Sequence, residues 1–260
     1  MLDAPNVIVA HRTNPLSELP IMRKGSQPTD GGFLLMDEAE RDEILLENKE
    51  LAPYIRKYMG ADDLINGKLR YCLWLKECPE DIMSSCDKLI ARLKNVANIR
   101  RNSSKELTRK WALKPHLFTE DRQPDMEYLM LPVVSSEKRQ YIPMAYNDST
   151  VIANTNSQMI PDAPIYVFGV LTSLIHSVWM KAVCGRLEMR FAYSASVVYN
   201  TFPFPSISDT KKSEIEEAAT NVLLARENYP EKTLADLYDP EKMPEDLRAA
   251  HEELDAIVES

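Results

Sequence analysis

Histidine, cysteine and glycine motifs are the features of this sequence most suited to catalysis, and their spacing does not favour it. The four histidines lie far apart in the sequence, and none has a carboxylate at a spacing typical of a catalytic pair. We therefore expect structural or surface roles for His11, His116, His176 and His251. No CxxC pair occurs among Cys72, Cys78, Cys86 and Cys184. Phosphate-loop, zinc-protease and nucleophile-elbow motifs are absent as well. The sequence therefore predicts no catalytic residue, no metal site and no disulfide framework.

Glu137 and Arg139 have the types and spacing that suit recognition of nucleic acid. They flank Lys138 at a predicted turn between two predicted strands. A carboxylate accepts a hydrogen bond from cytosine N4, while arginine donates to guanine O6 and N7. If both side chains share one face, the pair can contact one C·G base pair across both strands. The alternative is a solvated hairpin tip closed by an internal salt bridge.

Tyr141 follows Arg139 by two residues and so would share its strand face, since side chains alternate along a strand. We therefore count Tyr141 among the candidates for base contact. A tyrosine in the core or at its rim fits the same position equally well.

Basic residues are concentrated in one part of a chain whose formal net charge is −9. Residues 88–118 contain nine basic residues and one acidic residue. Residues 209–260 contain fifteen acidic residues and six basic ones, so much of the negative charge lies in the tail. Such segregation indicates a local anionic partner better than the total charge does, although an ordinary basic surface remains the alternative.

Polar and basic side chains surround a predicted loop that opens a helix near residue 105. Serine, lysine and arginine at such a place suit phosphate binding, because a helix N-terminus adds backbone donors. The candidate phosphate contacts there and at two predicted turns are Arg100, Arg101, Ser103, Arg109, Lys138 and Lys24.

The first part of the chain alternates predicted strands with predicted helices. Asp37, with Glu40 three residues later, predicts a capping box for a helix over residues 38–48. Asn66-Gly67 predicts a tight hairpin turn before a strand. Helical spacing predicts a helix over residues 86–98 and another that runs through Trp111. The predicted strands cover residues 6–11, 33–36, 69–76, 129–135, 139–144 and 151–153.

The second part becomes helical from about Ile165. Helices are predicted over residues 166–184 and 211–228 and after Pro244, with a proline-stiffened segment at residues 200–208. We therefore expect an α/β (α+β) domain over residues 1–164, followed by a mainly helical region over residues 165–260. No stretch reaches the ~18–20 apolar residues of a membrane span and no signal peptide is recognisable, so we expect a cytoplasmic protein without a membrane partner.

Several sequence segments resemble the region downstream of the catalytic domain in MmeI-like (type IIL) restriction–modification enzymes and their methyltransferase relatives. They occur in the same order along nearly the whole chain. They are LPIMRKGSQPTDGG, GADDLINGKLRYCLWL, NVANIRRNSSKELTRKWALKPHLF, VVSSEKRQYIPM, YNTFPFPSIS and LADLYDPEKMPEDLRAAHEELD. In that family one polypeptide joins an adenine-N6 methyltransferase to a target-recognition domain and a C-terminal helical region. This chain resembles only the last two.

The resemblance implies that the chain recognises a specific sequence of double-stranded DNA and has no catalytic centre of its own. It implies that Glu137 and Arg139 contact bases and that Ser104 or Lys105, both of them candidates for base readout, also touches a base edge. The glycine-rich turn for S-adenosylmethionine and the Asn/Asp-Pro-Pro-aromatic loop of adenine methyltransferases are absent. The cofactor would bind in a methyltransferase domain of the same polypeptide, a partner of this chain.

Two other functions remain open from the sequence. The acidic tail helices would suit a protein-interaction module that docks a partner subunit, in which case the basic segment is incidental. A free-standing enzyme would need catalytic residues that the sequence does not reveal.

Overall fold

The computed structural model describes residues 8–260, which form two compact units. The first unit contains residues 8–23, Glu127–Tyr146 and Gln158–Ser260, and the second contains Lys24–Met126 and Asn147–Ser157. Each unit is thus assembled from separate stretches of the chain. This division differs from the predicted boundary at residues 164 and 165, because strands on both sides of that boundary join the sheets of the first unit.

The second unit is built on a four-stranded sheet in the order β2-β4-β3-β8. Strand β4 pairs antiparallel with β2 and with β3, and β3 pairs parallel with β8. The bounds are β2 Leu35–Met36, β3 Ile55–Met59, β4 Tyr71–Leu73 and β8 Ile152–Ala153. The buried side chains Leu34, Leu51, Leu73, Leu89 and Val96 join this sheet to the helices in one core.

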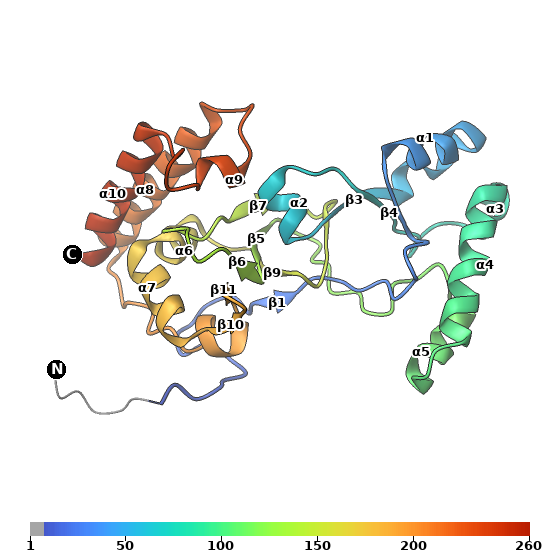
Figure 1. The fold of residues 1–260 in the computed structure, drawn as a ribbon, viewed down its shortest axis with the longest axis horizontal. Coiled ribbons are helices and arrows are strands. Elements are labelled where there is room, and N and C mark those ends of the chain that lie inside the picture. Colours follow the sequence, from blue (N-terminus) through green and yellow to red (C-terminus); the bar gives the residue numbers. More distant parts are fainter. Residues whose placement is uncertain (1–7) are drawn as a thin grey trace. The chain divides into compact units, whose positions relative to one another are not determined.

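The helices of the second unit are mostly short, and α4 is the longest among them (Figure 1). Asp37 accepts a hydrogen bond from the Glu40 amide and Glu40 accepts one from the Asp37 amide, which confirms the predicted capping box. The bounds are α1 Glu38–Glu47, η1 Lys49–Tyr54, α2 Ala61–Asn66, α3 Glu80–Ser84, α4 Asp87–Arg101, α5 Glu106–Lys110 and η2 Trp111–Leu113.

The hairpin turn predicted at Asn66-Gly67 is wrong. Asn66 ends helix α2, and Gly67 caps that helix in the left-handed conformation at φ 64°. A two-residue hairpin turn and a helix C-cap both require positive φ, so the same Asn-Gly pair serves either structure.

The first unit contains the sheet β10-β11-β6 and most residues of the sheet β1-β9-β5-β7. Lys24, Asn147 and Ser157, which lie at strand ends of the latter sheet, are assigned to the second unit. The larger sheet has the bounds β1 Arg23–Lys24, β5 Tyr128–Pro132, β7 Ala145–Asn147 and β9 Ser157–Pro161. The smaller one has the bounds β6 Val134–Ser135, β10 Gly185–Leu187 and β11 Arg190–Ala192.

Helices cover the rest of the first unit. The predicted helix at residues 166–184 is two helices, α6 and α7, bent by 60°. Gly169 of α6 approaches α8 closely, since a Cβ there would lie 2.8 Å from the Ile215 Cγ2. The bounds are α6 Ile165–Thr172, α7 Leu174–Val183, a π-helix at Ala195–Tyr199, α8 Asp209–Glu227, α9 Leu234–Leu237 and α10 Glu245–Glu259.

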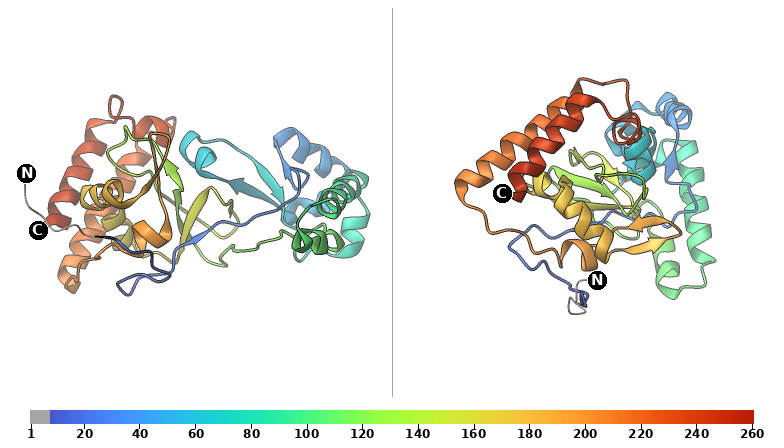
Figure 2. Two further views of the ribbon diagram at one scale, coloured as in Figure 1. Left: turned by 60° about the horizontal axis from the view of Figure 1, so that its bottom comes forward. Right: turned by 60° about the vertical axis from the view of Figure 1, so that its left-hand side comes forward.

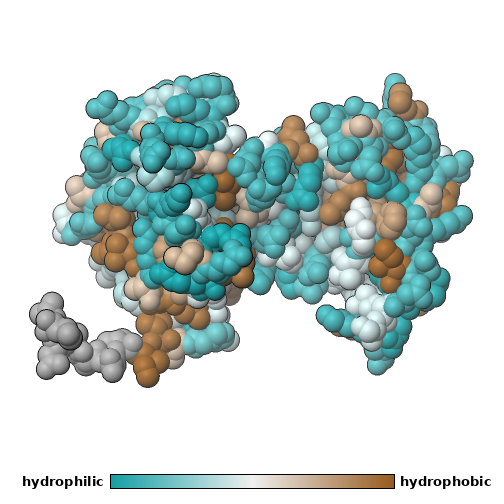
Figure 3. All heavy atoms as spheres, in the orientation of Figure 1, coloured by the Kyte–Doolittle hydropathy of each residue, from teal (hydrophilic) through white to brown (hydrophobic). Residues whose placement is uncertain are grey.

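The tail helices α8 and α10 lie side by side in both views of Figure 2. Their apolar stripes are buried in the core of the first unit, through Ile215, Ala219, Val222, Leu247 and Leu254. The face over α8–α10 that is visible in Figure 3 is mainly hydrophilic. The mixed α/β fold with a helical C-terminal region agrees with the fold class that the sequence predicts.

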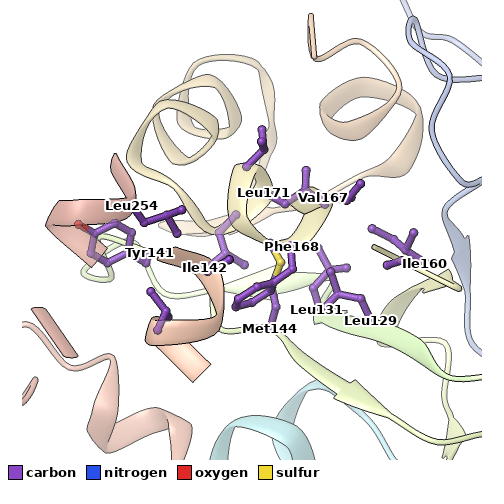
Figure 4. Close-up of a cluster of buried hydrophobic side chains, with 14 of the residues drawn as sticks. Leu129, Leu131, Tyr141, Ile142, Met144, Ile160, Val167, Phe168, Leu171 and Leu254 are labelled. Carbon is purple, nitrogen blue, oxygen red and sulfur yellow. The ribbon is translucent and has the colours of Figure 1, made fainter. Parts of the chain in front are cut away.

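Two predicted strands are not formed by the described residues. Residues 139–144 form an irregular segment, in which Tyr141, Ile142 and Met144 enter the core beside Leu254 and Phe168 (Figure 4). Burial of consecutive residues does not follow the period of two that a half-buried strand needs. The predicted strand at residues 6–11 lies partly outside the described residues, and its described part is not a strand.

Within the described residues no single helix has the length and apolarity to cross a membrane, and only the bent pair α6 and α7 passes that test when the two are taken together.

Candidate nucleic-acid interface

A short loop, residues 102–105, connects α4 to α5 in the second unit. The Asn102 amide donates to the Asn98 carbonyl at 3.1 Å, and the Ser103 amide to the Arg100 carbonyl at 3.2 Å. The Arg109 Nη1 donates to the carbonyls of Ser103 and Ser104 at 2.9 and 3.0 Å. Arg109 therefore holds the loop from within α5, which leaves the exposed side chains of Ser104 and Lys105 free to face solvent.

Arg100 is buried, so its predicted contact with phosphate is wrong. Its side chain is among the largest that the protein buries completely. The guanidinium makes five hydrogen bonds to main-chain carbonyls, and burial lowers the pKa of Arg100. The acceptors are Pro28 (2.7 Å), Thr29 (3.0 Å), Trp111 (3.2 Å), Lys114 (2.8 Å) and Leu117 (2.7 Å). Arg100 thus fixes two loops against the end of α4.

Several other basic residues of this segment are already paired. Lys88 forms an ion pair with Glu43 at 2.9 Å, and Lys110 forms one with Glu106 at 3.0 Å. Arg92 donates to the Phe33 and Leu35 carbonyls and also pairs with Glu40. Arg109 makes no ion pair either, but its guanidinium bonds the loop carbonyls. Among the described residues, four exposed cations of the segment make neither an ion pair nor a side-chain hydrogen bond, namely Lys94, Arg101, Lys105 and Lys114. These four, rather than the whole segment, are available to an anionic partner.

Lys24 lies in the two-residue strand β1 and is exposed. The next residue, Gly25, packs against the backbone of β8, where a Cβ would lie 2.3 Å from the Asn154 carbonyl oxygen. The Gly25 amide donates to the Ser157 carbonyl at 3.1 Å. The backbone beside Lys24 is therefore fixed, while its side chain remains accessible.

The second candidate surface is the turn at residues 136–139 in the first unit. The Arg139 amide donates to the Ser136 carbonyl at 3.3 Å, and the Lys138 amide to the Ser136 hydroxyl at 3.3 Å. Glu137 and Lys138 are exposed, and Arg139 is half-buried. Both Glu137 and Arg139 belong to the described residues, and no ion pair joins them. The internal salt bridge considered above is therefore not formed.

A second Glu-x-Arg sequence in the same unit provides the contrast. Glu188 and Arg190 flank the tip of the β10–β11 hairpin, and their side chains form an ion pair at 2.9 Å. Glu188 adopts a positive φ of 58° at this tip. The same residue types at the same spacing are thus internally paired in one place and unpaired in the other.

Arg139 faces a groove whose other wall is the loop after α9. Ser136, Lys138 and Arg139 line one side, and Ala235, Asp239, Pro240 and Glu241 line the other. The Arg139 Nε is buried without a hydrogen-bond partner within the described chain. Burial lowers the pKa of Arg139, while the charge of Asp239 opposes that change. The approach of Asp239 to Arg139 could not be predicted from the sequence, because a hundred residues separate them.

Tyr141 cannot reach a base edge in this fold, so its predicted role in base contact is wrong. Its side chain is 2% exposed, and its hydroxyl donates to the Asp255 Oδ2 at 2.7 Å. Its ring stacks on His251 with centroids 4.1 Å apart. The prediction placed Tyr141 on the same strand face as Arg139, and the structure has no strand there.

His176 and Cys72 are two of the titratable side chains that are completely buried within the described residues. His176 is completely buried, and burial lowers its pKa to about 3. Burial raises the pKa of the Cys72 thiol. No group of three histidine, cysteine, aspartate or glutamate side chains with metal-binding geometry occurs within residues 8–260. The Gly31–Gly32 pair leads into β2 rather than into a helix, so it does not fit the cofactor turn of a methyltransferase.

Models of two known protein domain families match nearly the whole length of the chain. The family model of the MmeI target recognition domain matches residues 3–206, and that of the MmeI C-terminal domain matches residues 207–260. The two matches meet inside the first structural unit, which contains Gln158–Ser260.

A curated relative and a solved structure agree with these matches. DNA methyltransferase A of Bacillus subtilis (strain 168) is 42% identical over 259 residues, which are 100% of this chain and 29% of the relative. The structure of the type IIL restriction–modification enzyme MmeI in complex with DNA is 42% identical with a TM-score of 0.95, over 99% of this chain and 34% of that one. The chain thus spans about a third of the proteins it matches. It belongs to the MmeI family, as the target recognition domain followed by the C-terminal domain.

Proposed function

We propose that this chain recognises a specific double-stranded DNA sequence, as the non-catalytic segment of a longer adenine-N6 DNA methyltransferase. The observation that carries the proposal is the match of the target recognition domain model over residues 3–206. The 42% identical structural neighbour was solved in complex with DNA, and the curated relative is named a DNA methyltransferase. S-adenosylmethionine would bind in a methyltransferase domain outside this chain, and the whole protein would work in the cytoplasm.

In this proposal, base readout rests first on Glu137 and Arg139. Arg139 has a buried Nε without a partner, and Glu137 is exposed beside it without an ion pair. Glutamate would accept from cytosine N4 and arginine would donate to guanine O6 and N7, so that the two contact one C·G base pair. The base contact would come from the Arg139 Nη atoms, because the Nε is buried. A guanidinium without an ion pair gains more from such a contact than one already in a salt bridge.

Phosphate contacts would come from the exposed basic residues of the second unit. Arg101, Lys105 and Lys24 are exposed and make no ion pair within the described chain. Ser103 and Ser104 add hydroxyls on the loop that Arg109 holds, and Ser104 with Lys105 would also touch base edges. Lys138 is exposed at the turn and would contact phosphate there. Each cation that neutralises a phosphate releases a counterion, so binding would weaken with salt.

The experiment exchanges the chemistry of the pair without changing the net charge. The double variant Glu137→Lys/Arg139→Asp presents a donor in place of the acceptor and an acceptor in place of the donor. Its preference, measured by selection from randomised duplexes and sequencing, should move from C·G towards G·C at one position of the site. The other positions and the salt dependence should stay the same.

The matched control applies the same exchange to the salt-bridged pair. Glu188→Lys/Arg190→Asp exchanges the two charges of the ion pair at the β10–β11 tip and also leaves the net charge unchanged. It should keep the original preference at every position. If the Glu137/Arg139 exchange folds and likewise keeps every preference, these residues do not contact bases. If the unchanged chain shows neither sequence preference nor salt-dependent binding, the DNA proposal itself fails.

A protein-interaction module is less well supported. The apolar stripes of α8 and α10, which would dock a partner, are buried in the first unit's own core. No observation in the described residues favours this alternative.

A further inference from the structure

We propose that Tyr141 and Asp255, together with Arg226 and Tyr238, are positioning residues that hold the turn at residues 136–140 in one conformation for base readout. This inference rests on the proposed function of Glu137 and Arg139. It assigns to the C-terminal helices a part in sequence preference that does not require them to touch DNA.

The turn is fixed on its N-terminal side by the smaller sheet. Val134 and Ser135 of β6 pair with Ala192 and Phe191 of β11. The Tyr193 amide donates to the Val133 carbonyl at 2.7 Å, which extends the contact by one residue. The chain therefore enters the turn from a hydrogen-bonded strand.

On the C-terminal side, Tyr141 provides the first anchor. Its hydroxyl donates to Asp255 Oδ2 at 2.7 Å, while Asp255 Oδ1 accepts from the Leu174 amide at 2.7 Å. One carboxylate of α10 thus joins the turn segment to the start of α7. The stacked ring of His251 and the apolar Leu254 pack beside Tyr141, as Figure 4 shows for Leu254. Burial raises the pKa of Asp255 and of Tyr141, as expected of a contact removed from water.

Arg226 of α8 provides the second anchor. Its Nη1 donates to the Met144 carbonyl at 2.6 Å, and its Nη2 donates to the Tyr238 hydroxyl. Because that hydroxyl accepts from Arg226, its own proton is available to His251 Nε2, which lies 2.9 Å away. His251 stacks on Tyr141, so both anchors belong to one buried polar cluster.

Between these anchors the five residues 136–140 make few hydrogen bonds of their own. Their described hydrogen bonds are the two within the turn and one from Gln140 to the Tyr141 hydroxyl at 3.3 Å. Hydrogen bonds to base edges weaken steeply with distance and angle, and a recognition site needs its groups placed to within about 0.5 Å. A turn with so few contacts of its own receives that precision from its ends.

The test compares Tyr141→Phe with Tyr146→Phe in the 260-residue chain. Both variants remove one hydroxyl from a tyrosine of the same unit, but Tyr146 donates to the Ala163 carbonyl at 3.0 Å, outside the turn and its anchors. Tyr141→Phe should reduce discrimination between C·G and the other pairs at one position by about fivefold, a part of what a good base contact supplies. Other positions, and the slope of binding against salt, should not change. Tyr146→Phe should leave all preferences unchanged.

A second variant tests the positioning role again, and the unchanged chain tests the base contact on which that role depends. Tyr238→Phe breaks the link from Arg226 to His251 and should reduce discrimination at the same position, which provides a test if Tyr141→Phe does not fold. Unchanged discrimination in the folded variants, or an equal loss with Tyr146→Phe, overturns the positioning role. If the unchanged chain shows no preference at any position, it is the proposed base contact that fails instead.

Discussion

Replacing Arg100 separates a structural role from a DNA-binding role within the basic segment. The sequence places Arg100 beside Arg101 at the end of a basic helix, where both suggest phosphate contacts. In the structure Arg100 is 0% exposed and makes five hydrogen bonds, whereas Arg101 is exposed and makes no ion pair within the described residues. We therefore expect Arg100→Ala to destabilise the second unit, and Arg101→Ala to weaken DNA binding.

The magnitude follows from the five carbonyls that Arg100 contacts. Hydrogen bonds from a charged donor at about 1.5 kcal/mol each would set an upper limit of roughly 7 kcal/mol. Only the bond to Pro28 is fully buried, so water can reach the other four carbonyls after truncation. The variant also no longer bears the cost of burying a charge. We expect the free energy of unfolding to fall by about 3–5 kcal/mol.

Urea denaturation, followed by the fluorescence of Trp74 and Trp111 in the same unit, measures this loss. DNA binding at several salt concentrations, below the temperature at which the variant unfolds, should give an unchanged salt slope for Arg100→Ala. Arg101→Ala should instead stay within about 0.5 kcal/mol of the original stability and lose up to ~0.9 from the slope. An Arg100→Ala variant with full stability and a reduced slope would refute the buried role.

Three further predictions concern packing, pH and the cofactor. Gly25→Ala should lower the free energy of unfolding by about 3 kcal/mol in urea titrations, because its Cβ would lie 2.3 Å from the Asn154 carbonyl oxygen. In the control Gly185→Ala the Cβ meets nothing within 4 Å, so stability should not change. The pKa of His176 is about 3 in the folded chain, so as the pH falls the unfolded chain binds the proton first. The free energy of unfolding should therefore fall by about 1.4 kcal/mol per pH unit below ~6.5. Urea titrations at pH 7 and pH 5 should show a smaller loss for His176→Phe than for the original chain. Calorimetry should detect no binding of S-adenosylmethionine to this chain, and micromolar binding would contradict its role as a segment without the cofactor site.

Local patterns in the sequence predicted the elements whose stabilising contacts are also local. Asp37 and Glu40 satisfy each other's amides within one helical turn, so four residues suffice to place the start of α1. Helical spacing located α4, α8 and α10 for the same reason. The hairpin turn predicted from Asn66-Gly67 was wrong because the pair indicates only a positive φ, which a hairpin turn and a helix cap both use.

The site residues were harder to predict, because their environments depend on distant parts of the chain. Arg100 is buried only because carbonyls from Pro28 to Leu117 converge on it, and nothing in its neighbouring residues signals that convergence. Tyr141 is bound by Asp255, which lies 114 residues further along the chain. The exposed loop and turn, with Ser104, Lys105, Glu137 and Lys138, have the accessibility that the sequence suggested. Contact with DNA remains a prediction for each of them.

The two Glu-x-Arg sequences show what the structure adds to a motif. At the β10–β11 tip, Arg190 pairs with Glu188, so the arginine's charge is already compensated. Arg139 has Glu137 at the same spacing, yet it keeps a buried Nε without a partner and a pKa lowered by burial. A buried unpaired donor costs about 1–3 kcal/mol, which a different rotamer or a small shift of the turn would otherwise recover. The anchors at Tyr141 and Met144 oppose that shift. The fold therefore retains an arginine that makes no ion pair or side-chain hydrogen bond with the described residues, and its Nη atoms, rather than the buried Nε, are those that an external acceptor such as guanine would contact.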